Sequence, residues 1–502
     1  MQRLGNKAYK KGVIFLQGRI KKSFAGLISG LIISLSSSGL VGADEAYDVY
    51  NYDRWGEAIP SQAGYLARFS VSGSDLGTDD FSSPKDIFID RSGLFYIVDS
   101  GNNRIVITDK GLREVKNIID NFTYRGEKLT LKNPQGIFVS DEGDIYIADT
   151  ENSRVIRTDI NGNADLIIEK PVSELYPENL TFLPQKVIAD KAGYVYVVVN
   201  NITSGSVMYN KDGEFVGFYG ANRVEKTGKV IWKYFWKRLS PDNMKKYMKD
   251  SVPAPITSFD IDKDGFVYTC SNSLTQELDA IKKVNAAGYN LFADFEVHFG
   301  DAPTADYSEY PENSYVDIDV NGDGLISCLD YSTGRIFQYD EDCNLLFIIG
   351  SSGNQLGTFR QVSAVESDDK CIYVADSQKN TITVFEETVF GSIVHQATRL
   401  YNDGYYEEAL EPWFEVLKRD GNYRRAYIGI ASAMINNGNY SEAMKYAKLA
   451  DSQWQYDRAF EGWRTEFINK YFGIISLVLI ITAAIVFLLV RKIKKAKGGC
   501  RK

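Results

Sequence analysis

A short acidic segment has the residue types and spacing of a calcium-binding loop. Counted from residue 319, positions 1, 3, 5 and 12 are held by Asp319, Asn321, Asp323 and Asp330. However, a related Asp-Xaa-Xaa-Gly turn recurs along the chain, and Asp and Gly are the residues that a tight hairpin requires. We therefore favour a hairpin turn, keep a calcium loop as the alternative, and expect no other cofactor.

Three pairs of oppositely charged residues recur at the same place in successive copies of a repeated pattern. They are Asp99 and Arg104, Asp149 and Arg154, and Asp330 and Arg335. A catalytic constellation is unique in a chain, whereas these pairs are repeated. We interpret them as structural ion pairs or turn anchors and predict that none is catalytic.

Histidine is scarce, and this bears on catalysis. His298 and His395 are the only two in 502 residues, and they fall in different segments. Metal-dependent hydrolysis and lyase chemistry usually need histidine beside carboxylates, or a general base near neutral pH. The sequence also contains no GxSxG or HExxH motif. It therefore favours a protein that is not an enzyme, with an all-carboxylate site as the alternative.

One basic and aromatic segment, residues 221–255, interrupts the repeated pattern. Its centre holds Trp232, Tyr234, Phe235 and Trp236 together with Lys233, Lys237 and Arg238. Aromatic rings beside cations can stack on sugars, hold an anionic wall polymer or a lipid headgroup, or dock a protein partner. The alternative is a flap whose rings pack on the protein, and the sequence leaves the two interpretations open.

The elements that position these residues form an internal repeat. The stretch at 136–163 matches the one that starts at residue 86, and Pro84, Pro134 and Pro184 open three copies at a fixed step. Further copies lie at 256–272, 314–336 and 362–382. Apolar residues alternate within each copy and Gly-containing turns separate the runs, which predicts four antiparallel strands per copy.

Six four-stranded copies predict a β-propeller, in which the sheets are arranged radially about a channel. The last copy ends near Phe385 without an outer strand, so we predict that residues 65–71 supply it and close the ring. The Gly-Xaa-Ile-Tyr-Xaa-Ala-Asp and Asn-Xaa-Arg-Val patterns of the second copy resemble the NHL-repeat propellers. We expect a mainly β protein, with a six-bladed propeller at 44–388 and a smaller all-α part.

The segment at 390–457 resembles a pair of tetratricopeptide (TPR) repeats. Gly404, Tyr406 and Ala409 recur thirty-four residues later as Gly438, Tyr440 and Ala443. Small residues at these positions let antiparallel helices approach closely. Residues 458–471 are expected to form a capping helix that leads into the membrane.

Both ends of the chain predict a membrane topology. Residues 1–43 read as a signal peptide, and an uncleaved anchor is the alternative. The uncharged segment 472–490 is about as long as the ~30 Å hydrocarbon layer is thick. A basic tail, 491–502, follows and indicates a cytoplasmic C-terminus. The sequence thus predicts a single-pass protein of the cell membrane whose region from residue 44 to 471 lies outside.

Charge and topology together suggest a class of function. All 66 acidic residues lie between the two basic ends, so this region repels nucleic acid. We expect a bacterial surface protein that binds a protein or glycan partner. Its layout resembles that of accessory components of solute-uptake systems, which implies membrane transporter components as partners. The alternative is a propeller hydrolase, lactonase or lyase acting on a carbohydrate-derived substrate in the channel.

Overall fold

The structure is a computed structural model of the whole chain. It describes residues 46–53, 55–222, 253–272, 279–294, 299–301 and 313–498. The predicted signal peptide, His298 and the aromatic and basic residues at the centre of 221–255 lie outside these residues.

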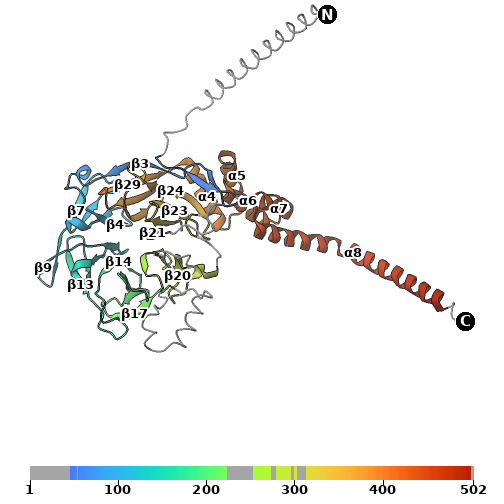
Figure 1. Ribbon diagram of the computed structural model, residues 1–502, viewed down its shortest axis with the longest axis horizontal. Coiled ribbons are helices and arrows are strands. Elements are labelled where there is room, and N and C mark those ends of the chain that lie inside the picture. Colours follow the sequence, from blue (N-terminus) through green and yellow to red (C-terminus); the bar gives the residue numbers. More distant parts are fainter. Residues whose placement is uncertain are drawn as a thin grey trace, which may run out of the picture. The chain divides into compact units, whose positions relative to one another are not determined.

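Six sheets form the blades of a β-propeller, as the repeat predicts (Figure 1). Blade 1 contains β4 (Pro84–Ile89), β5 (Phe95–Asp99), β6 (Arg104–Thr108) and β7 (Val115–Ile119). Blade 2 contains β10 (Gly136–Val139), β11 (Ile145–Asp149), β12 (Arg154–Thr158) and β13 (Asn163–Ile168). Blade 3 contains β14 (Pro184–Ala189), β15 (Val195–Val199), β16 (Ser206–Tyr209) and β17 (Phe215–Tyr219).

The other three blades follow the same antiparallel order. Blade 4 contains β18 (Ile256–Ile261), β19 (Val267–Ser271) and β20 (Ile281–Val284). Blade 5 contains β21 (Tyr315–Val320), β22 (Ile326–Asp330), β23 (Arg335–Tyr339) and β24 (Leu345–Ile349). Blade 6 contains β27 (Val362–Ser367), β28 (Cys371–Asp376) and β29 (Thr381–Glu387).

The ring closes as predicted, because the outer strand of blade 6 comes from the other end of the propeller sequence. Strand β3 (Tyr65–Val71) pairs antiparallel with β29, with Val71 opposite Ile382 and Ser70 opposite Thr383 (Figure 1). Every blade edge that would otherwise lie open at the seam is therefore paired.

Two blades differ from the predicted four strands. In blade 2 a hairpin of β8 (Asn121–Tyr124) and β9 (Glu127–Thr130) adds to β13 in parallel, which gives a six-stranded sheet. Blade 4 has three strands among the described residues, followed by the short helix η4 (Leu291–Asp294). Two small ladders, β1 (Tyr50–Tyr52) with β2 (Ala58–Pro60) and β25 (Ser351–Ser352) with β26 (Thr358–Phe359), lie outside the blades.

Tight turns join the first two strands of each blade. In blade 1 the Asp90 carboxylate accepts a hydrogen bond of 2.9 Å from the Leu94 backbone N–H, and Gly93 has a φ of +83°. A side chain is disfavoured at that angle, which explains the glycine. Asn321 and Gly324 form the same turn in blade 5, where Asn321 accepts from the Leu325 N–H at 3.0 Å.

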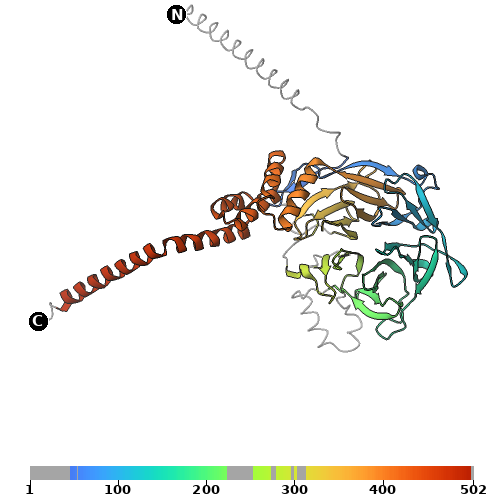
Figure 2. The same cartoon turned by 180° about the vertical axis from the view of Figure 1, so that it is seen from behind.

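Five helices follow the propeller. They are α4 (Val389–Asn402), α5 (Leu410–Arg419), α6 (Arg424–Asn436), α7 (Tyr440–Leu449) and α8 (Gln453–Gly498). The first of these helices lie against the propeller (Figure 2). Phe390, Trp413 and Tyr423 from this part are buried in one core with Leu346 and Phe347 of blade 5. The helices and the propeller therefore share a hydrophobic core.

Buried polar contacts strengthen this junction. The Arg425 guanidinium contacts the Asp340 carboxylate at 2.8 Å, and both side chains are almost completely buried. The Tyr423 hydroxyl donates to the Leu346 carbonyl at 2.9 Å, and His395 Nε2 lies 2.8 Å from Gln338 Oε1. Moving the helices away from blade 5 would leave these buried polar groups without partners, which is costly. The contacts therefore hold the helices in one position on blade 5.

Helix α8 is long and apolar enough to cross a membrane over part of its length, with a mean hydropathy of 3.0 in its most apolar window. The segments predicted separately as a capping helix (458–471) and a membrane span (472–490) belong to this single unbroken helix. The first turns of α8 pack on α7, and Ala459 of α8 is fully buried.

Candidate functional site

The innermost strand of each blade lines the centre of the propeller. Alternate residues of a strand point to the same side, so each strand contributes equivalent positions at two levels. We call the first level the upper layer: Asp86, Gly136, Lys186, Ser258, Asp317 and Ala364. We call the second level the lower layer: Phe88, Phe138, Ile188, Asp260, Asp319 and Glu366.

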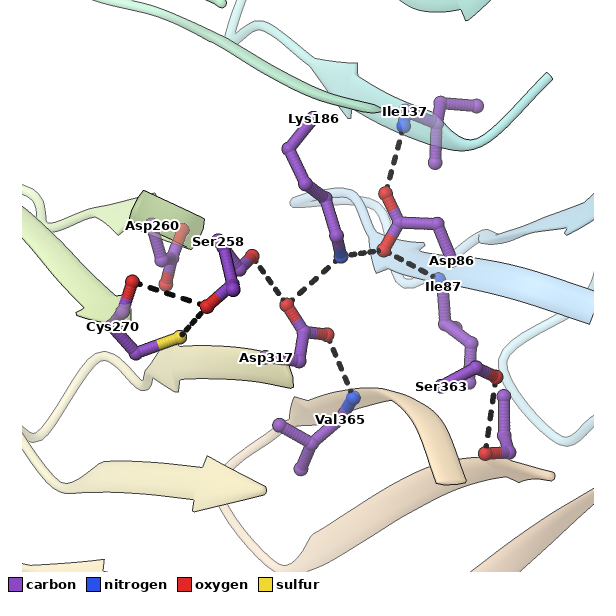
Figure 3. A network of polar contacts seen from close by, with 12 residues as sticks. Asp86, Ile87, Ile137, Lys186, Ser258, Asp260, Cys270, Asp317, Ser363 and Val365 are labelled. Carbon is purple, nitrogen blue, oxygen red and sulfur yellow. Dashed lines mark hydrogen bonds and ion pairs between the residues drawn. The ribbon is translucent and has the colours of Figure 1, made fainter. Parts of the chain in front are cut away.

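Lys186 is the cation of the upper layer and joins blades that lie far apart in sequence. Its Nζ lies 2.5 Å from Asp86 Oδ1 of blade 1 and 2.9 Å from Asp317 Oδ1 of blade 5 (Figure 3). All three side chains are at least 88% buried, with exposed fractions of 12%, 4% and 4%. One ammonium group thus bridges three blades across the channel.

The two carboxylates of the upper layer also accept hydrogen bonds from neighbouring blades. Asp86 Oδ2 accepts from the Ile137 N–H at 2.8 Å. Asp317 accepts from the Ser258 hydroxyl at 2.5 Å and from the Val365 N–H at 2.9 Å (Figure 3). All six blades are therefore tied to this network, which is the arrangement expected of a central structural link.

The electrostatics of the upper layer follow from burial and pairing. Burial alone would lower the pKa of Lys186, but the charges of Asp317 and Asp86 outweigh it and hold that pKa above its usual value. Burial raises the pKa of Asp86 to about 6 in spite of the attraction of Lys186. Lys186 is therefore charged at neutral pH.

The lower layer is divided into an apolar and an acidic half. Blades 1 to 3 contribute Phe88, Phe138 and Ile188, and the two rings pack with their centroids 5.2 Å apart. Blades 4 to 6 contribute Asp260, Asp319 and Glu366.

The three acidic side chains of the lower layer are held by hydrogen bonds from neighbouring strands. Asp260 accepts from the Val320 N–H at 2.8 Å, Glu366 accepts from the Ile89 N–H at 3.0 Å, and Asp319 accepts from the Ser367 hydroxyl. Burial, with some repulsion between the carboxylates, raises the pKa of Asp260 to about 7 and raises those of Asp319 and Glu366 well above their usual range. This half of the layer therefore retains protons at neutral pH.

The free space between the two layers is small. The cavity lined by Lys186, Asp260 and Glu366 has a volume of about 20 Å³, which is room for roughly one water molecule. Its chemistry is limited to holding water and exchanging protons among carboxyl groups.

Replacing Asp260 with Asn is expected to flatten the pH dependence of stability. A carboxyl whose pKa is about 7 in the folded state and near 4 in the unfolded chain costs stability as pH rises between those values. The variant should therefore match the parent near pH 4 and exceed its free energy of unfolding by up to about 4 kcal/mol above pH 7. Urea denaturation at pH 4.5 and pH 8 measures this, and an equal effect at both pH values would contradict it.

The recurring charged pairs lie at the ends of second strands, away from the channel. Arg104 Nε contacts Asp99 Oδ2 at 2.7 Å, and Arg154 Nε contacts Asp149 Oδ2 at 2.8 Å. Each carboxylate also accepts a backbone N–H from the preceding loop, at 2.7 Å from Ser82 for Asp99. These contacts fit ion pairs that anchor turns.

The third pair requires a correction. Asp330 anchors its turn through the Ser314 N–H at 2.7 Å and the Thr333 hydroxyl at 2.6 Å, without the arginine. The Arg335 guanidinium instead contacts Asp301, which also accepts from the Tyr52 hydroxyl at 2.7 Å. Thr333 takes the place that Asn102 and Asn152 hold in blades 1 and 2, where each asparagine donates to the carboxylate three residues before it.

The four residues of the calcium-like motif are spread along blade 5. Asp319 faces the channel, Asn321 shapes the hairpin, and Asp323 contacts Arg399 of α4 at 3.1 Å. Asp330 is opposite Tyr315, four residues along β21 from Asp319. In this arrangement the four side chains do not converge.

One stretch of this chain matches a known repeat family, and the chain is distantly similar to solved structures. The NHL repeat family matches residues 131–157, and no curated protein matches the chain. Virginiamycin B lyase from Staphylococcus aureus is 10% identical to this chain, with a TM-score of 0.40. The match covers 64% of this chain and 100% of the lyase chain. A putative gluconolactonase is 11% identical to this chain, with a TM-score of 0.39. The match covers 68% of this chain and 98% of the gluconolactonase chain. Similarity at this level says nothing about what this chain binds.

Proposed function

We propose that this chain is a membrane-anchored binding protein of the cell surface, whose propeller recognises a protein or glycan outside the membrane and whose helical part contacts a membrane partner. The observation that carries the proposal is the shared core between blade 5 and the helices, which continue without a break into the apolar part of α8. A propeller fixed to a span in this way is suited to presenting a recognition surface.

The helical part has the features of a TPR pair. Four helices of ten to fourteen residues follow one another in sequential contact. A side chain at Gly429 of α6 would lie 2.5 Å from the Trp413 ring of α5, so these helices require a small residue where they meet. Gly404 and Gly438 follow α4 and α6 with φ values of +85° and +75°.

A row of aromatic side chains on α8 supports contact with a protein partner near the membrane. Neighbouring rings of Tyr456, Phe460, Trp463, Phe467 and Tyr471 lie 4.8 to 6.4 Å apart, centroid to centroid. Phe460 and Trp463 are 41% and 36% exposed. With a span that begins at Phe472, Phe460 lies about 18 Å above the hydrocarbon layer. Lipid headgroups cover only about 5–8 Å of that height.

The alternative function, an enzyme with its substrate in the channel, has less support. Its substrate would need to enter a cavity of about 20 Å³ that Lys186 and its partners occupy. His395 lies in α4 and contacts Gln338 and Glu387, with no group of the channel among these contacts.

Photo-crosslinking on intact cells tests the proposed function. A photoreactive residue at Phe460 is expected to form adducts with an integral membrane protein, identified by mass spectrometry. The same group at Thr465, exposed on the opposite face of α8, is the matched control and should not form them. Adducts with lipid alone, or equal adducts from both positions, would contradict a protein partner at this face.

A further inference from the structure

A pocket of about 340 Å³ lies between blades 3 and 4, within the usual size range of small-ligand sites. Four amide side chains line it: Gln185, Asn200, Asn201 and Asn272. Val199 and Ile256, which are 2% and 5% exposed, contribute apolar surface. Among the described residues that line the pocket, none is charged.

The pocket lies where the repeat departs from its own pattern. In blades 1 and 2, a hydroxyl after the second strand joins one blade to the next: Ser100 donates to the Pro134 carbonyl at 2.5 Å, and Thr150 donates to the Pro184 carbonyl at 2.6 Å. The equivalent positions in blades 3 and 4 are Asn200 and Asn272.

The anchoring aspartate is replaced in the same two blades. Val199 and Ser271 occupy the positions that Asp99 and Asp149 hold in blades 1 and 2. Blades 3 and 4 have therefore lost the ion pair, and neither Asn200 nor Asn272 makes the contact of Ser100 and Thr150. Blade 4 is joined to blade 5 through its first strand instead, where the Thr257 hydroxyl donates to the Tyr315 carbonyl at 2.7 Å. Departures from a structural rule that fall together on one pocket are typical of functional sites.

The four amides are available for a ligand. None of their side chains makes a hydrogen bond with another of the residues that the structure describes. Asn102 of blade 1, by contrast, donates to Asp99 at 2.8 Å and to the Asp80 carbonyl at 2.9 Å. Structural amides of this propeller can thus be satisfied internally, whereas those of the pocket face solvent.

From this arrangement we infer that the pocket binds a neutral polyhydroxylated ligand, namely a sugar unit of a glycan. Each amide offers both donors and an acceptor, which complements hydroxyl groups that also do both. The apolar surface of Val199 and Ile256 suits the C–H face of a sugar ring. The absence of charge in the described lining disfavours anionic sugars and nucleotides. The inference rests on the proposed recognition function and gives it a location and a ligand class.

Calorimetric titration of the full-length protein in nanodiscs tests the inference. The probes are the neutral disaccharides maltose, cellobiose and lactose, with an uncharged Gly/Ser hexapeptide as the competing class. At least one disaccharide is expected to bind with a Kd below about 10 mM. Replacing Asn200 and Asn272 together with Ala should weaken binding about tenfold or more, since several hydrogen bonds are lost. Gln378→Ala, an exposed amide of blade 6, is the matched control and should leave the Kd unchanged.

Each outcome is decisive. Binding that is lost in the double variant and kept in the control supports the pocket as a sugar site. Binding that survives in the double variant overturns the location and leaves the proposed function standing. Binding of the hexapeptide alone, or of no probe, overturns the ligand class. The crosslinking from Phe460 is independent of all these results, so a failure of the pocket is distinguishable from a failure of the proposed function.

Discussion

Replacing Lys186 with Met should lower the free energy of unfolding by about 3–5 kcal/mol, the usual cost of removing one partner from a buried ion pair. The variant would leave Asp86 and Asp317 facing one another across the channel, with exposed fractions of only 4% each. Methionine has a similar length and is apolar, so the loss of charge, rather than a cavity, is the main change.

The cost should depend on pH. Without the ammonium group, the burial of unpaired carboxylate charge and the repulsion between the carboxylates destabilise the folded state. Both effects weaken as pH falls, because fewer carboxyl groups of the site then carry charge. We therefore expect a larger destabilisation at pH 8 than at pH 5, measured by urea denaturation followed by circular dichroism. Lys211→Met, on an exposed turn of blade 3, is the matched control. A similar small loss in both variants would show that the buried bridge contributes nothing.

A rescue variant separates charge from packing. Adding Asp86→Asn and Asp317→Asn to Lys186→Met removes both unpaired carboxylates while keeping the acceptor oxygens for the Ile137 and Val365 N–H groups. Replacing a whole buried ionic group by neutral residues is often close to neutral in stability. The triple variant should therefore recover most of the lost free energy.

The propeller was predictable because its signal is repeated. Six runs of alternating apolar residues, five of them followed by a Gly-containing turn, locate six first strands within two residues of where they lie. The missing outer strand near Phe385 implied a donor strand, and β3 supplies it. The spacing of the copies and the alternation of apolar residues can be read directly from the sequence. The number of blades and the closure of the ring could therefore be predicted.

Features that depend on contacts distant in the chain were not predictable in the same way. The β8–β9 hairpin extends blade 2 because β8 reaches β13 some forty residues later. Arg335 contacts Asp301, whose partners include the Tyr52 hydroxyl. Neither contact has a local signature, and the spacing of Asp330 and Arg335 alone suggested a pair between them.

The central site has no repeated signature in the sequence. The residues of the upper layer differ from one blade to the next. They can be recognised only when the third residue of each first strand is compared, counting from Pro84 in blade 1, which gives Asp86, Lys186, Ser258 and Asp317 in blades 1, 3, 4 and 5. That comparison would have shown one basic and two acidic residues on a common ring. The volumes of the channel and of the pocket between blades 3 and 4 depend on side-chain packing, which no sequence pattern reports.

Covalent closure of the ring is expected to give the largest gain in stability. Ser70 of β3 and Thr383 of β29 are opposite one another, and their hydroxyl oxygens are 3.0 Å apart. Cysteines at both positions are therefore close enough to form a disulfide. The bond would link residues 313 apart in sequence, and constraining a loop of more than a hundred residues in the unfolded chain is worth up to about 5 kcal/mol.

The oxidised Ser70→Cys/Thr383→Cys variant should thus unfold at a higher urea concentration than its reduced form, with the crosslink identified by peptide mapping. The chain has four described free cysteines of its own, so the parent protein under the same oxidising conditions is the control. Ser72→Cys with Thr383→Cys is the mismatched pair, because Ser72 lies beyond the end of β3. Preferential bridging between residues 72 and 383, or no gain on oxidation of the matched pair, would mean that the ring does not close through β3 and β29. A gain specific to the matched pair would establish that the two ends of the propeller sequence hold the ring together, because only a folded seam brings these positions into register.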